Sequence, residues 1–153
     1  LQTVVDKMRI ANALASAANG TALELRFAEG DRLYREGDQV KLQLTNRTTE
    51  HVTVFAISSS GDMGLIYPVA DLGDPLATPS NSALDLPLAV TAPFGADHII
   101  AIETQNDSAA LRDALIKAET DGDIRAFWEM FRSEAVYLAA PPNVTVFPFY
   151  TAP

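Results

Sequence analysis

The sequence predicts a mainly β fold, with antiparallel strands arranged as a sandwich or barrel and helices at both ends of the chain. Short stretches that alternate apolar and polar residues recur every ~10 residues through the middle of the chain, and turn residues separate them. The apolar residues whose spacings of three and four predict helices lie before residue 20 and after residue 106.

The first element is expected to be a helix between Thr3 and Asn19. Asn19-Gly20 supplies a left-handed stop, and the apolar stripe that we expect to be buried comprises Val4, Met8, Ala11, Leu14, Ala15 and Ala18. Residues 1–20 are therefore interpreted as an N-terminal helix or a linker. Residues 21–153 are interpreted as a β-sandwich domain that includes the C-terminal helices.

After Gly20 the apolar residues alternate with polar ones, which predicts strands. They are expected at Leu23–Phe27, Val40–Leu44, His51–Ser58, Met63–Tyr67, Leu84–Val90 and Asp97–Thr104. The strand from His51 is apolar on both faces and should lie inside a sheet. Pro87 interrupts the strand from Leu84, which favours an edge position.

Helical periodicity returns near the C-terminus. Asp107 or Ser108 can cap a helix that Gly122 ends, and its expected buried side is Leu111, Leu115 and Ala118. Asp123 can cap a second helix with Ile124, Phe127, Trp128 and Phe131 at helical spacing. Val144 to Phe149 reads as a final strand that rejoins the sheet.

Composition and net charge limit the classes of partner that the chain can bind. The chain has 153 residues, one domain by size, and 48% of them are hydrophobic, so it can bury a core without metals or disulfides. Eleven basic residues against twenty acidic ones give a net charge of −9, which repels phosphate backbones and anionic lipids. We therefore expect a protein or peptide partner, no nucleic acid and no membrane insertion.

Cysteine is absent, which excludes thiol catalysis and disulfides. Because both cytosolic and exported proteins can lack cysteine, the compartment stays open, and an extracytoplasmic location is one alternative. The chain begins at Leu1, which suggests a fragment of something longer.

Several landmarks occur in a recognisable order. Tyr34 and Gly37-Asp38 precede an alternating strand, an apolar strand and a Ser/Gly turn lead to Tyr67-Pro68, and Pro93-Phe94-Gly95 precedes a short apolar strand. Over residues 33–104 this order resembles a bacterial domain family of unassigned function, often found C-terminal to caspase-like (metacaspase-type) peptidase domains. One departure is His51-Val52, where members often have Gly-Tyr. The resemblance implies an immunoglobulin-like β-sandwich and carries no catalytic residues.

A search for catalytic or metal-binding patterns gives little. Ser58-Ser59-Ser60-Gly61 lacks the glycine of a nucleophile elbow and reads as a hairpin turn. Asp97 and His98 are adjacent on a strand, so they should point to opposite faces. His51 and His98 show no metal spacing, and the weak calcium candidates are Asp71, Asp74 and Asp85. No catalytic residue and no cofactor is therefore predicted.

The favoured hypothesis is a non-catalytic accessory or protein-interaction domain of a larger bacterial, caspase-like peptidase-associated protein. Its partner would be a protein or peptide, the parent's own catalytic domain included, captured by strand addition near Leu84 to Val90. The interaction candidates are Leu84, Leu86, Leu88, Phe94, Phe149 and Tyr150. The alternative is a small acidic hydrolase with an unrecognised carboxylate/histidine site, which would need a pocket that joins His51 or His98 to several acidic residues.

Overall fold

The computed structural model describes residues 2–17, 23–45, 51–67, 84–104, 109–137 and 143–153. Within these ranges, the side chains of residues 3, 15, 17, 84 and 134–137 are outside the described part. The predicted stop at Asn19-Gly20 and the calcium candidates Asp71 and Asp74 therefore lie outside the described residues.

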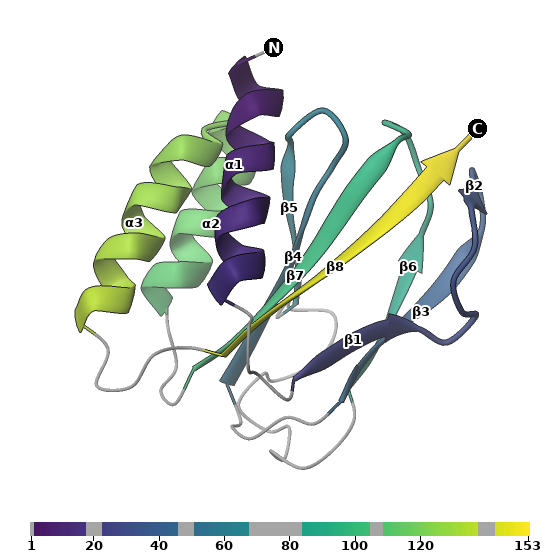
Figure 1. Ribbon diagram of the computed structural model, residues 1–153, viewed down its shortest axis with the longest axis horizontal. Helices are drawn as coiled ribbons and strands as arrows, with labels where there is room; N and C mark the ends of the chain where they lie inside the picture. The colour runs from purple at the N-terminus through teal and green to yellow at the C-terminus, as the bar shows by residue number, and fades with distance from the viewer. Residues whose placement is uncertain (1, 18–22, 46–50, 68–83, 105–108, 138–142) are drawn as a thin grey trace.

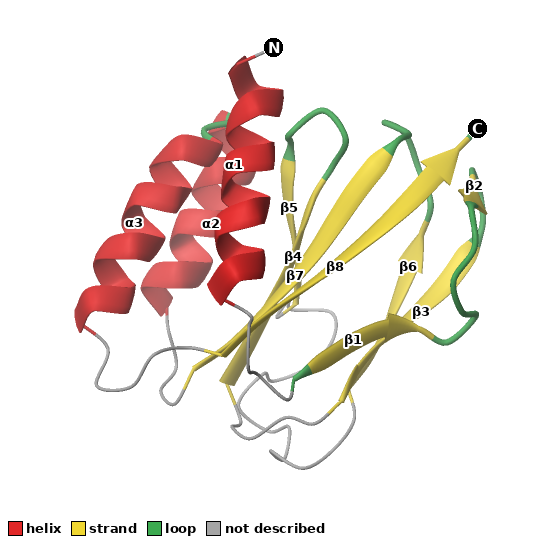
Figure 2. Ribbon diagram, viewed as in Figure 1, coloured by secondary structure: helices red, strands yellow, loops and turns green. Residues whose placement is uncertain are grey.

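Three layers make up the fold (Figures 1 and 2). Helices α1 (Gln2–Ala17), α2 (Ala109–Asp121) and α3 (Ile124–Tyr137) pack on one face of a five-stranded sheet, and a three-stranded sheet packs on its other face. None of the described helices is both long enough and apolar enough to span a membrane.

The two sheets draw strands from the whole chain. The five-stranded sheet has the order β2 (Tyr34–Arg35), β8 (Asn143–Ala152), β7 (Ala96–Thr104), β4 (His51–Ile57), β5 (Met63–Tyr67). The three-stranded sheet has the order β1 (Glu24–Phe27), β3 (Gln39–Thr45), β6 (Leu84–Ala89). The last strand, β8, lies inside the larger sheet between β2 and β7.

The prediction of a mainly β chain with helices is confirmed, and the immunoglobulin-like arrangement stays a prediction. One strand pair departs from the expected antiparallel pattern: β2 runs parallel to β8, with Tyr34 opposite Thr151. The two strands lie far apart in the chain, so no hairpin turn forces them to be antiparallel. At β2 the larger sheet curls toward the three-stranded sheet (Figure 1).

Side chains of the five-stranded sheet alternate between two cores. On β4 and β7, Phe55, Ile57, Ile100 and Ile102 face the helices, while Val52, Val54, Ile99 and Ala101 face the three-stranded sheet. This confirms that the strand from His51 is covered on both faces. Burying each large apolar side chain contributes about 1.5–3 kcal/mol before entropy is counted, so β4 and β7 anchor the fold.

The buried face of α1 differs from the predicted stripe. Val4 and Met8 are exposed, whereas Lys7 is almost fully buried together with Ile10, Ala11 and Leu14. The Lys7 stem packs under the helix, and its ammonium donates a hydrogen bond to the Ala96 carbonyl oxygen. Because the prediction counted only apolar residues, it placed the buried face of this helix too far toward Val4 and Met8.

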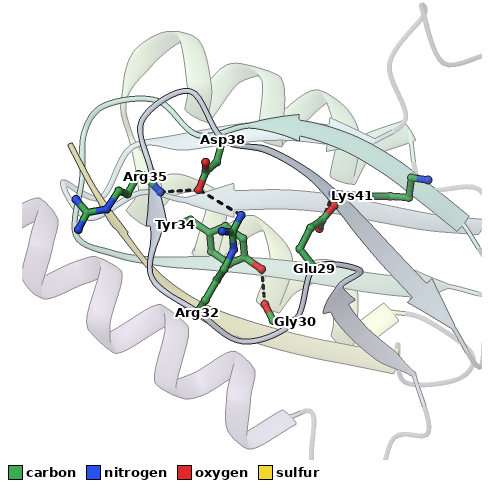
Figure 3. A network of polar contacts seen from close by, with 7 residues as sticks. All are labelled: Glu29, Gly30, Arg32, Tyr34, Arg35, Asp38 and Lys41. Atoms are coloured by element: carbon green, nitrogen blue, oxygen red, sulfur yellow. Dashed lines mark hydrogen bonds and ion pairs between the residues drawn. The ribbon is translucent and has the colours of Figure 1, made fainter.

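A polar network holds the connection from β1 through β2 to β3 (Figure 3). The Tyr34 hydroxyl donates to the Gly30 carbonyl oxygen, and the Arg32 guanidinium lies 4.8 Å from the centre of the Tyr34 ring. Asp38 accepts the backbone N–H of Arg35 at 2.9 Å and pairs with Arg32 at 3.4 Å. These contacts all lie within the connection and hold the buried Tyr34 ring in place. The backbone N–H of Glu36, which donates to the Ala152 carbonyl oxygen at 2.9 Å, joins this segment to β8.

Candidate functional site

A groove of about 260 Å³ opens between the two sheets on the side where β5 and β6 are the edge strands. We call it the inter-sheet groove. Its walls include Val40, Leu88 and Val90 from the three-stranded side, and Ala56, Gly64, Ile66 and Ile99 from the five-stranded side. Phe149, Thr151 and Asp97 line it as well.

Two small residues leave this space open. Ala56 on β4 lies directly opposite Gly64 on β5, so both occupy the same face of the sheet. A Cβ atom added at Gly64 would meet no atom within 4 Å. Protein interiors otherwise pack to high density, so two neighbouring positions with almost no side chain create a void.

The sheets also differ in width. The three-stranded sheet reaches from β1, which contacts β8, to β6, and β5 extends past it. Gly64, Leu65 and Ile66 of β5 are accordingly only half-buried, although the strand belongs to a sheet with covered faces elsewhere.

Among the described strands, β6 is the edge of the three-stranded sheet, and its alternate backbone groups point outward. The backbone N–H of Val90 donates to the Asp38 carbonyl oxygen at 2.9 Å, and the Val90 carbonyl oxygen accepts from Gly37 at 3.0 Å. In an antiparallel strand every second residue bonds to the same neighbour, so Leu88, two residues before Val90, also bonds to β3. The backbone groups of Asp85, Pro87 and Ala89 therefore point away from β3. Pro87 has no N–H and occupies an outward position, where proline is tolerated in an edge strand.

The edge of β5 is different because a helix covers it. Glu119 of α2 accepts a hydrogen bond from the backbone N–H of Leu65 at 3.3 Å. That N–H points away from β4, so the Glu119 carboxylate accepts the hydrogen bond that a neighbouring strand would otherwise accept. Of the two edges beside the inter-sheet groove, β6 is the one whose outward groups have no such cover among the described residues.

Asp97 closes one end of the inter-sheet groove. One of its carboxylate oxygens accepts the backbone N–H of Ser59 at 2.7 Å, and the other accepts the Thr151 hydroxyl at 3.1 Å. Burial raises the pKa of Asp97, and these hydrogen bonds together with the charge of Lys7 oppose that rise. A buried acid with a raised pKa beside an apolar cavity is a feature of binding and catalytic sites.

Two turns meet around this carboxylate. The Ser59 hydroxyl donates to the Phe94 carbonyl oxygen at 3.0 Å, which joins the β4–β5 turn to the β6–β7 turn. The backbone N–H of Gly95 donates to the Thr151 hydroxyl oxygen at 3.1 Å, and the N–H of Thr151 donates to the Gly95 carbonyl oxygen at 2.9 Å. This end of the groove is therefore fixed by three separate segments.

The predicted interaction residues are dispersed. Leu88 and Phe149 line the inter-sheet groove, Leu86 is buried in the core between the sheets, and Phe94 is half-buried against that core. Tyr150 is 63% exposed, on the opposite face of β8 from Phe149. Leu84 belongs to β6, and its side chain is outside the described part.

The predicted metal and histidine positions do not converge among the described residues. Asp85 is exposed on β6, and no cluster of three or more His, Asp or Glu side chains in the described ranges could hold a metal ion. The two histidines lie at opposite ends of the β4–β7 pair. His51 begins β4 opposite Thr104, whereas His98 lies opposite Ile57 at the other end of β4. As predicted, His98 and Asp97 point to opposite faces, since Asp97 lines the groove and His98 shares the parity of Ile100 on the helix side.

The inter-sheet groove itself was not predicted from the sequence. Its usable signals were an aspartate at the start of an otherwise apolar strand and the small residues Ala56 and Gly64 within apolar strands. Neither signal is specific, because the pairing of Ala56 with Gly64 depends on the hairpin register. That register includes an irregularity between Val54 and Phe55.

One protein-family model matches part of this chain. Residues 33–107 contain a domain that matches the family model described as Domain of unknown function (DUF4384). No curated protein and no solved structure matches the chain. The matched range runs from before β2 to after β7, so it holds Val40, Ala56, Gly64, Leu88 and Asp97 of the groove, while Phe149 and Thr151 lie on β8 outside it.

Proposed function

We propose that this chain is a non-catalytic accessory domain that binds an extended segment of a protein partner. The segment would add a fourth strand to the three-stranded sheet beside β6. The observation that supports this most directly is the position of the outward backbone groups of Asp85, Pro87 and Ala89, next to an open apolar groove. Strand addition obtains affinity from main-chain hydrogen bonds and specificity from alternate side chains.

The inter-sheet groove suits such a strand. Side chains on one strand alternate between faces, so every second side chain of the added segment would point inward toward Gly64 and Ile66 of β5. The bound segment would cover the half-buried part of β5 and complete the apolar layer between the sheets. The groove walls are mostly apolar around the single carboxylate of Asp97, a lining that suits the binding of a side chain.

The resemblance described above suggests where the partner segment comes from. We infer that the domain is a part of a larger bacterial protein with a caspase-like peptidase domain, and that the segment belongs to that parent or to its substrate. An immunoglobulin-like β-sandwich, which the resemblance implies, would fit this role as an appended module. Immunoprecipitation of the native product followed by mass spectrometry tests this, and a free product without any parent chain would contradict it.

The binding mode is tested with a phage-displayed library of random heptapeptides. The library is selected against the folded chain and counter-selected against Gly64→Trp, which fills the inter-sheet groove. Selected peptides are synthesised and titrated into the 15N-labelled chain, and amide hydrogen exchange is measured by NMR. We expect new protection at the amides of Asp85 and Ala89, whereas those of Leu86 and Leu88, which already bond to β3, should change little.

This alternation distinguishes strand addition from other modes. Protection at neither Asp85 nor Ala89, or peptides that bind Gly64→Trp as well as the unsubstituted chain, would reject the proposal. Failure to select any peptide above background would also reject it. Tyr150→Ala serves as the matched control, because this exposed side chain lies on the other face of β8 and should leave binding unchanged.

A further inference from the structure

We infer that the inter-sheet groove selects a lysine or arginine side chain of the bound segment, with its aliphatic stem in the apolar part and its cation at Asp97. This inference rests on the proposed function and specifies the chemistry of the partner. It follows from the combination of an apolar wall with one buried carboxylate at the end of the groove.

The carboxylate of Asp97 retains capacity for a ligand. Only 8% of Asp97 is exposed, and its two oxygens each accept one described hydrogen bond, from Ser59 and from Thr151. An ionised carboxylate offers about four acceptor positions, so two remain for a cation. Charge-assisted hydrogen bonds of this kind are about twice as strong as neutral ones.

The internal cation near Asp97 does not occupy this position. Lys7 reaches the sheet from α1, on the helix side, and its ammonium donates to the carbonyl oxygen of Ala96. Between described residues, no ion pair includes Asp97. The charge of Lys7 therefore acts on Asp97 from the opposite face of the sheet and leaves the groove side of the carboxylate for a ligand.

Other side chains fit this groove less well. A purely apolar side chain would remove the carboxylate further from water without offering it a partner, and such burial is costly for a charge. An acidic side chain would be repelled by Asp97 and by a chain with a net charge of −9. The stem of lysine or arginine, in contrast, can lie along Val40, Leu88 and Ile99 while its charged end reaches Asp97.

Binding of such a side chain should depend on pH. The ionised form of Asp97 is the one that holds a cation, and burial raises the pKa of this group, so affinity should fall as the pH decreases through that pKa. The charged or titratable groups nearest to it are Lys7 of α1 and His98 on the opposite face of β7; Ser59 and Thr151 are neutral. Burial lowers the pKa values of Lys7 and His98, with Lys7 as the second cause for His98.

The test uses the heptapeptide whose binding protects Asp85 and Ala89. Three versions carry lysine, norleucine or glutamate at the inward position nearest Asp97, and their dissociation constants are measured by isothermal titration calorimetry. We expect the lysine version to bind about 10-fold tighter than the norleucine version, which is the size of one charge-assisted hydrogen bond. The glutamate version should bind more weakly than both.

Substitution of Asp97 provides the second arm. Asp97→Asn keeps the shape of the side chain and should remove the preference for lysine over norleucine, together with its dependence on pH. Asp113→Asn is the matched control, because Asp113 is exposed on α2, away from β6 and the inter-sheet groove, and contributes the same charge to the whole chain. The pH dependence of lysine-peptide binding to the unsubstituted chain gives an independent readout if Asp97→Asn does not fold.

The outcomes separate this inference from the proposal on which it rests. Norleucine and lysine peptides that bind equally, with protection at Asp85 and Ala89, would overturn the cation inference and keep strand addition. An equal loss of lysine preference in Asp113→Asn would replace a specific contact with general charge attraction and also overturn it. Absence of protection with every peptide would reject strand addition itself.

Discussion

The two open sides of the sandwich are closed in different ways. On the side of β1 and β2, the Phe27 ring lies 4.9 Å from Tyr34, 5.1 Å from Phe147 and 5.0 Å from Phe149, centre to centre, each edge to face. On the side of β5 and β6, the corresponding space between the sheets is lined by Gly64 and Ala56 and stays open. We call the side of β1 and β2, where the rings pack together, the filled side, and the side of β5 and β6 the empty side. Phe27 and Phe149 also line the inter-sheet groove, and a separate hollow of about 440 Å³ opens beside Phe27 and Phe147.

The strand edges differ in the same way. At the filled side, β2 curls against β8 and the polar network around Tyr34 fixes the connection from β1 to β3 (Figure 3). At the empty side, Glu119 covers β5 but the outward groups of β6 are left without such a contact in the described residues. We therefore expect the filled side to contribute more to stability, and we propose that the partner strand binds at the empty side.

Removing the central ring of the filled side should have the largest effect. Phe27→Ala takes away a side chain that is 3% exposed and touches three other rings, so we expect a loss of about 3–5 kcal/mol in the free energy of unfolding. Chemical denaturation measures this change. Tyr150→Ala is the control at an exposed aromatic and should change stability by less than about 0.5 kcal/mol.

A loss below about 1 kcal/mol for Phe27→Ala would mean that the aromatic cluster relaxes into the space and that the filled side is not the more stable one.

The junction of the two turns at the groove end should come second. Gly95 has a φ of 140°, and a Cβ atom there would lie 2.9 Å from the Cβ of Ser59. Gly95→Ala therefore combines backbone strain with a clash, and we expect a loss of about 1–3 kcal/mol. Thermal denaturation followed by circular dichroism measures it, and an unchanged melting temperature would show that this turn is not held against Ser59.

Much of this layout was accessible from the sequence because it follows from local periodicity. The apolar strand from His51, the edge strand interrupted by Pro87 and the caps at Gly122 and Asp123 are all set by residues close to one another in the chain. The Asp123 carboxylate accepts the backbone N–H of Ala126 at 3.0 Å, and Gly122 has a φ of 70°. The parallel pairing of β2 with β8 was not accessible, since it joins segments far apart in the sequence.

The candidate site was harder to predict for a similar reason. Its edge strand and two of its lining residues, Leu88 and Phe149, were identified from apolar patterns. In the sequence, Asp97 stands out only as half of an adjacent Asp-His pair, because its hydrogen-bond partners Ser59 and Thr151 come from other strands and turns. The misplaced face of α1 has the same origin, since the burial of Lys7 depends on the carbonyl oxygen of Ala96 on β7.

A smaller effect is expected from the polar contact that closes the filled side. Tyr34→Phe keeps the buried ring and removes the hydroxyl that donates to the Gly30 carbonyl oxygen, so the free energy of unfolding should fall by about 0.5–1.5 kcal/mol. Denaturant unfolding is the measurement. An effect as large as that of Phe27→Ala would show that the polar network in Figure 3, rather than the packing of rings, stabilises this side.

The smallest effect, and the one of opposite sign, is expected at the empty side. Gly64 does not need a left-handed backbone, and a Cβ atom there would meet nothing within 4 Å, so Gly64→Ala adds no strain. The substitution lowers the conformational entropy of the unfolded chain, so we expect the free energy of unfolding to rise by about 0.4–1 kcal/mol. A loss of stability would mean that the groove at Gly64 is already filled in solution, and strand addition beside β6 would then have no space for its inward side chains.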